Sequence, residues 1–438
     1  MSIPSAEYRQ RRERFMAYLD NGVAVIRSAP IAVMHNDVDY PYRQDSDFFY
    51  LSGFDEPDAA LILAPHCEQQ FVMFVQPRDP HKETWTGYLT GVEGAKERFG
   101  ADEAYPIGEL DEQLPQYLES ADRIYYHLGR DRAFNDKILG HWQRLVARYP
   151  RRGTGPIAIE DTKPIFHALR SLKSATELAM VRQAVAISAE AHERARSLTQ
   201  PGRYEYEIQA AIESTFRSRG AFGPAYPTIV ASGANACILH YIENQRQMQA
   251  QDLLLIDAGC AYGYYNADIT RTFPVGGRFS PEQKAIYELV LEAQAQVIAQ
   301  IQPGRGVNEF HDAAVRVLVE GLRELGILQG STDELIEQET YKPLFMHRTG
   351  HWLGLDVHDA GLYKQDGDRW QTLQPGHVLT VEPGLYMGPN VALPEGQPAV
   401  AERWRGIGVR IEDDVAVTAE GHEVLSAEVP KSIAAMEA

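Results

Sequence analysis

Apolar and polar positions along the first third of the chain follow two different periods, which together predict strands separated by helices. Charged residues at helical spacing predict helices, and short apolar runs bounded by turn residues predict strands. The predicted helices cover residues 6–20 and 134–149, and the predicted strands cover residues 22–26, 59–64, 71–75 and 123–127. This alternation is typical of an α/β domain.

The aromatic residues of segment 37–53 are interspersed with acids and with Arg43. Two interpretations fit this composition, a binding surface and a packed turn whose aromatic side chains join the core. The pattern favours the packed turn, because large aromatic side chains are more often buried than exposed.

A domain boundary is indicated near residue 172. Residues 151–156 and 161–164 are rich in Gly and Pro, and Ser174 and Glu177 then form a capping-box pattern at the start of a helix. That helix should continue to about Leu198, where Pro201-Gly202 ends it. We therefore expect an N-terminal α/β domain at residues 1–172 and a second domain at residues 173–438.

The second domain shows three more helical segments with short strand-like runs between and after them. The segments are residues 204–219, 280–302 and 307–325, and Ser280 with Gln283 repeats the capping-box pattern. Helices that alternate irregularly with short strands predict an α+β domain, with helices packed on a largely antiparallel sheet.

The composition of the chain excludes some classes of binding partner and indicates the cellular compartment. The 438 residues include 42 Lys and Arg against 61 Asp and Glu, a formal charge of -19, which argues against nucleic acid or an anionic membrane as the main partner. The 3 cysteines are too scattered for a disulfide framework or a thiolate zinc site. With no signal-peptide pattern and no apolar run long enough to span a bilayer, we expect a cytoplasmic protein.

Residues 346–359 contain three closely spaced histidines that are candidates for a functional site, namely His347, His351 and His358. Imidazole binds metals and carries protons near neutral pH. Taken alone, the segment favours such a functional site over a buried loop with incidental histidines, which stays open as the alternative. Acidic residues elsewhere in the second domain make the functional interpretation stronger.

Those acids end or border apolar strand-like runs. Asp257 follows residues 253–256, Glu382 follows residues 378–381, and a hairpin after Asp257 would place Asp268 on a neighbouring strand. In residues 406–415, alternation puts Arg410 and Glu412 on one face of a strand. Buried carboxylates are costly unless they are paired or bind a metal.

Four carboxylates and one imidazole form an oxygen-rich ligand set that suits Mn²⁺, with Co²⁺ and Zn²⁺ as alternatives. One ion does not ordinarily need so many protein ligands, and two ions bridged by carboxylates would acidify a shared water. Spacing alone leaves a mononuclear site and a buried ion-pair network open.

These residues and their flanks resemble the five-ligand signature of the pita-bread metallopeptidases. Within that family the chain is most similar to bacterial aminopeptidase P, through segments 351–359, 381–386, 406–414 and 42–53. The resemblance implies a creatinase-like N-terminal domain, a catalytic pita-bread domain and two divalent ions, most often Mn²⁺. It also implies hydrolysis of the bond between an N-terminal residue and a following proline.

The resemblance further implies a role for each matching residue. Asp257 would bind one ion, Asp268 and Glu412 would bridge both, and His351 and Glu382 would complete the second. Glu382 would also carry a proton from water to the leaving nitrogen. His240 and His358 would flank the substrate, Arg410 would hold a metal-bound carboxylate, and His347 and Tyr386 would contact the substrate or orient the ligands. Trp85 lies where the family can place an aromatic residue near a neighbouring subunit's site, which suggests a homodimer or homotetramer.

Two segments of the sequence depart from the family pattern, and two alternative functions fit the same residues. Arg348-Thr349-Gly350 replaces a more usual run of Gly and small or apolar residues, and segment 389–405 is somewhat long. Prolidase, which accepts Xaa-Pro dipeptides only, has the same kind of site. A non-catalytic binding module is the remaining alternative, although such a module should have lost ligands.

Overall fold

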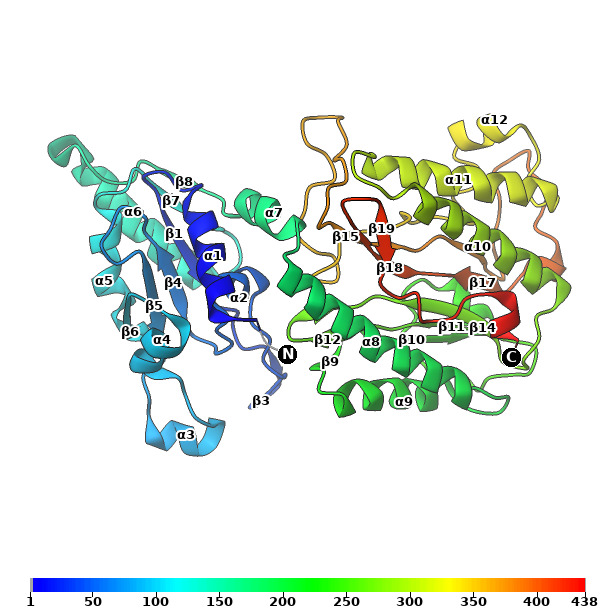
Figure 1. Cartoon of the computed structure of the whole chain (residues 1–438), viewed down its shortest axis with the longest axis horizontal. Helices are drawn as coiled ribbons and strands as arrows, with labels where there is room; N and C mark the ends of the chain where they lie inside the picture. The colour runs from blue at the N-terminus through cyan, green and yellow to red at the C-terminus, as the bar shows by residue number, and fades with distance from the viewer. Residues whose placement is uncertain (1–2, 438) are drawn as a thin grey trace. The chain divides into compact units, whose positions relative to one another are not determined.

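The computed structural model describes residues 3–437 and contains two compact units that divide between Leu169 and Arg170. The sequence places the boundary close by, at residue 172. Each unit has its own sheets and its own buried core (Figure 1).

The N-terminal unit is built on a six-stranded mixed sheet of order β6-β5-β4-β1-β7-β8. The four strands predicted from apolar runs are confirmed. The central strand β1 is parallel to β7 and antiparallel to β4. The strands of this unit are β1 (Val23–Arg27), β2 (Val33–His35), β3 (Val38–Asp39), β4 (Ala60–Leu63), β5 (Phe71–Val75), β6 (Glu103–Pro106), β7 (Arg123–Tyr125) and β8 (Ala158–Glu160).

Helices cover both faces of this sheet, as expected of an α/β domain. On one face, apolar residues of α5 and α6 pack on the strands in a single core. The helices are α1 (Ser5–Met16), α2 (Ser46–Ser52), α3 (Pro80–Thr86), α4 (Gly91–Phe99), α5 (Leu110–Leu118), α6 (Arg132–Arg152) and α7 (Lys163–Ser171), with a 3-10 turn η1 (Ile107–Glu109).

Two local predictions in this unit need correction. The first helix ends at Met16, and residue 20 cannot belong to it because Asp20 adopts a positive φ of 48°. The aromatic segment contains helix α2 rather than only a turn, although its Phe48, Phe49 and Tyr50 are buried as predicted. Asp45 caps this helix by accepting a hydrogen bond from the backbone N–H of Phe48.

The C-terminal unit contains four small sheets whose strand pairs are all antiparallel among the described residues. Helices lie on both sides of the strands (Figure 1), so the predicted α+β architecture is confirmed. The strands are β9 (Gly223–Pro224), β10 (Ile229–Ser232), β11 (Leu253–Asp257), β12 (Cys260–Tyr262), β13 (Tyr265–Asn266), β14 (Thr270–Pro274), β15 (Val378–Val381), β16 (Gly384–Met387), β17 (Ile407–Arg410), β18 (Asp413–Val417) and β19 (His422–Val424).

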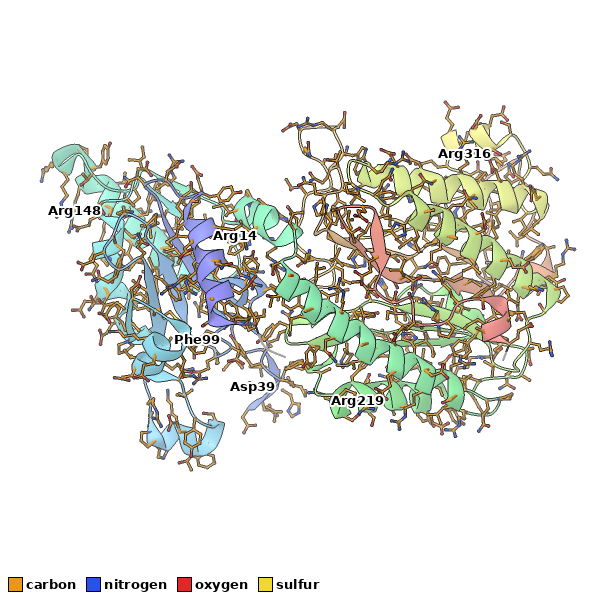
Figure 2. All side chains as sticks on the ribbon, in the orientation of Figure 1. Arg14, Asp39, Phe99, Arg148, Arg219 and Arg316 are labelled. Carbon is orange, nitrogen blue, oxygen red and sulfur yellow. The ribbon has the colours of Figure 1, made fainter. Side chains whose placement is uncertain are left out.

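The predicted helix starts in this unit are confirmed with their caps. Both Ser174–Glu177 and Ser280–Gln283 form complete capping boxes. Charged residues are exposed on and beside these helices, such as Arg316 and Arg219, the latter directly after the helix that ends at Ser218 (Figure 2). The helices are α8 (Ala175–Leu198), α9 (Glu205–Ser218), α10 (Pro281–Gln300), α11 (Val307–Glu324), α12 (Thr332–Glu337) and α13 (Ile433–Met436), with 3-10 turns η2 (Gly233–Cys237) and η3 (Glu402–Trp404).

None of the helices in residues 3–437 has the length and apolar character that crossing a bilayer requires.

Candidate metal centre and active site

A cavity of about 1290 Å³ opens in the C-terminal unit. Its walls come from strand ends and loops that are far apart in the sequence. All five predicted metal ligands line it, together with four other predicted site residues, three histidines and one arginine. The predicted residues in its lining are Asp257, Asp268, His351, Glu382, Glu412, His240, His347, His358 and Arg410.

The four carboxylates sit where strands begin or end. Asp257 is the last residue of β11, and Glu382 directly follows β15. Glu412 lies between β17 and β18, and its backbone N–H donates to the carbonyl of Thr270 at 3.0 Å. The sheets therefore deliver their strand ends to one place.

The hairpin predicted between Asp257 and Asp268 needs correction. Strands β11 and β14 do pair, but Thr270 is the residue opposite Asp257. The intervening residues form a smaller hairpin of β12 and β13, because Gly263 and Tyr264 turn the chain with positive φ values. Asp268 reaches the cavity from the segment just before β14.

The loop that carries His351 runs beside β15. The backbone N–H of Thr380 donates to the carbonyl of His351 at 2.9 Å, and that of Glu382 donates to the carbonyl of Thr349 at 2.8 Å. Gly350 makes this approach possible, because a Cβ there would lie 2.0 Å from the Thr380 carbonyl oxygen. Because glycine has no Cβ, the backbone at Gly350 can lie directly against β15, and this close approach positions His351 beside the strand.

Three of the predicted ligands form a tight cluster. Asp268, His351 and Glu412 each offer one ligand atom, and these atoms lie within 4.8 Å of one another. Nε2 of His351 is 3.4 Å from Oδ2 of Asp268 and 3.8 Å from Oε1 of Glu382. Glu382 therefore borders the same cluster.

Tyr226 joins Asp257 to this cluster. Its hydroxyl oxygen lies 2.6 Å from Oδ1 of Asp257 and 2.6 Å from Oδ1 of Asp268. Burial, and then the charges of the two aspartates, raise the pKa of Tyr226 well above its usual range. The phenol therefore stays protonated and acts as a hydrogen-bond donor.

Arg410 is the buried cation of the site. Its Nη2 donates to Oδ2 of Asp257 at 2.6 Å, and its Nη1 donates to the hydroxyl of Tyr386 at 3.1 Å. Its Nε donates to Oγ1 of Thr270 at 3.2 Å, and that hydroxyl donates to Oε2 of Glu412 at 2.7 Å. Arg410 thereby orients one carboxylate directly and another through Thr270.

The carboxylates strongly perturb one another. Burial, and then the charges of neighbouring acids, raise the pKa of Glu412 well above its usual range. Burial raises the pKa of Glu382 to about 7 against the opposing charges of His351 and Arg410. Burial opposes protonation of His351, but its hydrogen bond to Asp268 and the charge of Glu382 outweigh burial and raise its pKa to about 9.

This donor set fits divalent cations. Four carboxylates converge, and of the described cavity-lining residues Arg410 and His351 are those that place positive charge against them. Burial, and then the negative charge of neighbouring acids, raises the pKa of Glu412, and bound cations would neutralise that charge. Oxygen ligands with one imidazole suit Mn²⁺ and similar ions.

The other predicted histidines face the cavity in different ways. Nε2 of His347 is 2.8 Å from the hydroxyl of Tyr386, and its Nδ1 is 3.6 Å from Oε2 of Glu382. Burial lowers the pKa of His347 to about 4, so the ring is neutral at pH 7. The ring of His358 lies 4.3 Å from that of His351, centroid to centroid, and His240 is exposed on the cavity wall.

Two predicted substrate-binding residues do not line the cavity. Tyr386 is buried and reaches the site through its hydrogen bonds to His347 and Arg410. Trp85 belongs to α3 of the N-terminal unit, where its side chain is 80% exposed.

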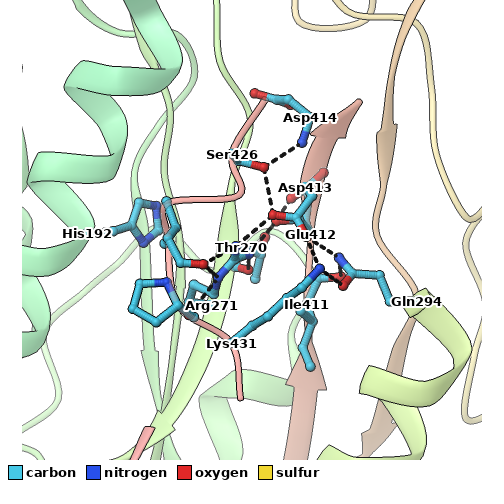
Figure 3. A network of polar contacts seen from close by, with 12 residues as sticks. His192, Thr270, Arg271, Gln294, Ile411, Glu412, Asp413, Asp414, Ser426 and Lys431 are labelled. Carbon is cyan, nitrogen blue, oxygen red and sulfur yellow. Dashed lines mark hydrogen bonds and ion pairs between the residues drawn. The ribbon is translucent and has the colours of Figure 1, made fainter. Parts of the chain in front are cut away.

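A buried polar network holds the backbone at Glu412 and the neighbouring Asp413 side chain in place (Figure 3). Nη1 of Arg271 donates to the backbone carbonyl of Glu412 at 2.6 Å, and its Nη2 donates to Asp413 at 2.7 Å. Lys431 and Ser426 also donate to the Asp413 carboxylate, at 2.5 and 2.6 Å. The segment between β17 and β18, which carries Glu412, is thus fixed by ion pairs as well as by the strands on either side.

Sequence reasoning missed Tyr226 and Thr270. Neither hydroxyl belongs to a spacing pattern, and the short segment Ala225-Tyr226-Pro227 carries no metal-ligand signature. Their functions depend on distances across sheets rather than along the chain. A buried hydroxyl between two acids becomes recognisable only once the acids are placed.

Comparisons with known proteins agree with this site and this fold. Residues 179–419 match Metallopeptidase family M24, and residues 8–125 match the Aminopeptidase P, N-terminal domain. The two matches fall in the two compact units.

The similarity to individual relatives and solved structures extends over nearly the whole length of both chains. The chain is 43% identical to Xaa-Pro aminopeptidase of Escherichia coli (strain K12), covering 100% of the chain and 98% of the relative. The structure of Pseudomonas aeruginosa aminopeptidase PepP matches with a TM-score of 0.95 and 48% identity, covering 100% of this chain and 98% of that one. A variant of Escherichia coli aminopeptidase P in complex with substrate matches with a TM-score of 0.93 and 41% identity, again covering 100% and 98%.

Proposed function

The chain belongs to Metallopeptidase family M24, and from its 43% identity to an Xaa-Pro aminopeptidase over the whole chain we propose that it has the same activity. It hydrolyses the peptide bond between an N-terminal residue and a following proline. The observation that carries this proposal is the convergence of four carboxylates and His351 in one cavity around Arg410. Residues 173–438 would form the catalytic domain, and residues 1–172 the creatinase-like N-terminal domain.

The ligand set would hold two divalent ions, and Mn²⁺ is the metal that we propose for both. Asp257 would bind one ion, Asp268 and Glu412 would bridge, and His351 and Glu382 would complete the second. When bound, such ions supply a water acidified to a nucleophile and polarise the scissile carbonyl. The clustering of Asp268, His351 and Glu412 supports the bridging assignment.

Glu382 would move the proton that the reaction requires. A general base works best when its pKa lies near the working pH, and burial raises the pKa of Glu382 to about 7. The carboxylate would take a proton from the attacking water and return it to the departing proline nitrogen.

The remaining residues would hold the substrate and the ligands. His240 and His358, on the cavity wall, would flank the scissile carbonyl and steady the tetrahedral intermediate. Neutral His347, held by Tyr386, would contact the proline ring. Arg410 would hold Asp257 in place through their ion pair.

The finer assignments of assembly and compartment are proposals as well. Trp85 and Tyr88 are 80% and 89% exposed, so this patch of the N-terminal unit offers apolar surface for a second subunit of a homodimer or homotetramer. The free thiols of Cys67, Cys237 and Cys260 support the reducing cytoplasm as the compartment.

A paired peptide assay tests the proposal. The purified chain, stripped with a chelator, is offered Ala-Pro and Ala-Pro-Ala with and without added Mn²⁺. We expect metal-dependent release of alanine from the tripeptide. Cleavage of the dipeptide alone would instead identify a prolidase, and failure to cleave either peptide in Mn²⁺ would leave a non-catalytic binding module.

A further inference from the structure

Two arginines line the cavity, and they are engaged in different ways. Arg410 is buried and bound to Asp257 and Tyr386. Arg348 is exposed on the wall, and it occupies a position where the family resemblance leads one to expect a glycine. Its charge therefore needs an explanation of its own.

Neutral groups hold the guanidinium of Arg348 in place. Its Nη2 donates to Oδ1 of Asn308 at 2.5 Å, and its Cζ lies 5.4 Å from the centroid of the Trp370 ring. Within residues 3–437, Arg348 has no ion pair with a carboxylate and no other side-chain hydrogen bond. One edge of the guanidinium fork thus remains available, in a fixed position, to a planar acid.

The charge of Arg348 acts inside the cavity. His311 also lines the wall, where burial, and then the charge of Arg348, lower its pKa to about 4. The acids in the lining already have partners, since Asp356 accepts from Arg170 at 2.8 Å and the others belong to the metal cluster. Arg348 is the lining arginine left for a charged group of the substrate.

The position of Arg348, next to His347 in the cavity wall, indicates which part of the substrate it would contact. His347, the preceding residue, lies 3.6 Å from Glu382 at the reacting centre. With the proline ring against His347, as proposed above, a third substrate residue on the Arg348 side of His347 would face this guanidinium. A carboxylate on that residue would be about 7 Å beyond the scissile carbonyl, within the reach of an arginine side chain anchored one residue further along.

We propose that Arg348 is a specificity-determining residue that binds a carboxylate on the third residue of the substrate, an inference that rests on the proposed aminopeptidase function. The carboxylate has two sources, the free C-terminus of a tripeptide and the side chain of Asp or Glu in a longer peptide. Arg348 takes no part in bond cleavage, so its contribution appears in KM.

The test compares Ala-Pro-Ala, Ala-Pro-Ala-amide and Ala-Pro-Asp-amide as substrates of the Mn²⁺-loaded full chain. We expect the wild type to favour the free tripeptide over its amide by roughly tenfold in kcat/KM, and Arg348→Met to remove that preference through KM alone. Arg348→Lys, which keeps the charge but not the fork, should retain part of it. The aspartyl amide then shows whether the acidic side chain substitutes for the free C-terminus.

Arg403→Met is the matched control, because Arg403 is also exposed and lies 5.4 Å over a tryptophan ring, that of Trp404, outside the cavity. It should keep the wild-type preference. A preference that survives in Arg348→Met, or a wild type that cleaves the three substrates equally well, would overturn the inference while leaving the aminopeptidase function standing. If none of the peptides is cleaved in the presence of Mn²⁺, both proposals fall.

Discussion

At the scale of single residues, Glu382 occupies an unusual position, because it borders the metal cluster and also has a pKa raised by burial to about 7. Glu382→Gln keeps an oxygen near the ions but removes the group that accepts the proton. We expect kcat on Ala-Pro-Ala to fall by about 10²–10⁴-fold. Steady-state kinetics with saturating Mn²⁺ measures this loss.

Glu320→Gln provides the control, since Glu320 is an exposed acid on α11. It should leave kcat unchanged. Turnover at the wild-type rate in Glu382→Gln, with metal bound, would show that another group carries the proton.

Protons and cations should compete for the same site. In the metal-free protein, protons remain on His351 up to about pH 9 and on Glu382 up to about pH 7. Metal binding must displace them, so the apparent affinity for Mn²⁺ rises as pH increases from 6 to 8. Its logarithm gains up to one unit per pH unit for each proton displaced.

Calorimetric titration in two buffers with different ionisation enthalpies counts the released protons directly. We expect proton release that is larger at pH 6 than at pH 8. An affinity independent of pH, without proton release, would mean that His351 and Glu382 do not bind the ions.

The sequence located the charged residues of the site because acids after apolar runs and closely spaced histidines leave a recognisable pattern. Tyr226 and Thr270 leave no such pattern, because a hydroxyl in a strand or a turn is commonplace. Their contacts with Asp257, Asp268 and Glu412 arise only when β11, β14 and the segment before β18 come together.

At the scale of elements, Gly350 controls how the histidine loop lies on β15. In Gly350→Ala the new Cβ would be 2.0 Å from the Thr380 carbonyl oxygen, so the loop must move away and take His351 with it. We expect Mn²⁺ affinity to fall by about 10–100-fold, as when a group that orients a metal ligand is lost. Titration calorimetry measures the change.

Gly388→Ala is the matched control, because the atom nearest to its Cβ would be Cys237 Cβ at 3.8 Å, an ordinary contact. Its Mn²⁺ affinity should equal that of the wild type. Equal affinities in the two variants would show that the loop accommodates a methyl group without moving His351.

The segment that carries Glu412, between β17 and β18, depends on the buried pair of Arg271 and Asp413, whose side chains are 2% and 0% exposed. Arg271→Leu leaves Asp413 with Lys431 and Ser426 alone, and breaking a buried pair costs about 3–5 kcal/mol of unfolding free energy. Arg316→Leu, which breaks only the exposed pairs of this residue with Glu320 on α11 and Asp333 on α12, should cost about 0–1 kcal/mol.

Urea unfolding followed by tryptophan fluorescence measures both variants. Similar losses of stability in the two would contradict a structural role for the network.

Element boundaries were predictable where the chain carries local signals. Ser174 and Ser280 begin their helices because a serine oxygen and a side chain three residues later satisfy free backbone N–H groups. Helix α6 extends beyond its predicted end at residue 149 and includes Pro150, because a proline in the last turn removes few hydrogen bonds. The helix then ends at Gly153, which has a φ of 69°. The small β12–β13 hairpin was not predictable, because it depends on pairing with β9.

At the scale of the whole molecule, composition and alternation were sufficient to predict an α/β domain followed by an α+β domain. The resemblance supplied the arrangement that periodicity cannot, namely which strand ends meet. Contacts between residues such as Arg410 and Asp257, which are 153 positions apart, leave no trace in a local window of sequence.

The division into two units predicts an uneven response to metal. All the proposed ligands belong to the unit that begins at Arg170, so bound ions stabilise that unit by mass action and leave the other unchanged. At a free Mn²⁺ concentration about 100 times Kd, the stabilisation is about 2.7 kcal/mol, which slows the exchange of amides that open with the unit by about 100-fold.

Hydrogen exchange followed by mass spectrometry, with and without Mn²⁺, reads both units in one experiment. Amides of β11, β15 and β18 should gain protection, because Asp257, Glu382 and Glu412 lie at their ends. Amides of β4 and β5 in the N-terminal sheet serve as the internal control and should exchange at the same rate in both conditions. Equal slowing in both units would mean that they open as one cooperative body, whereas unchanged exchange in β11 and β18 would mean that these strand ends do not hold the ions.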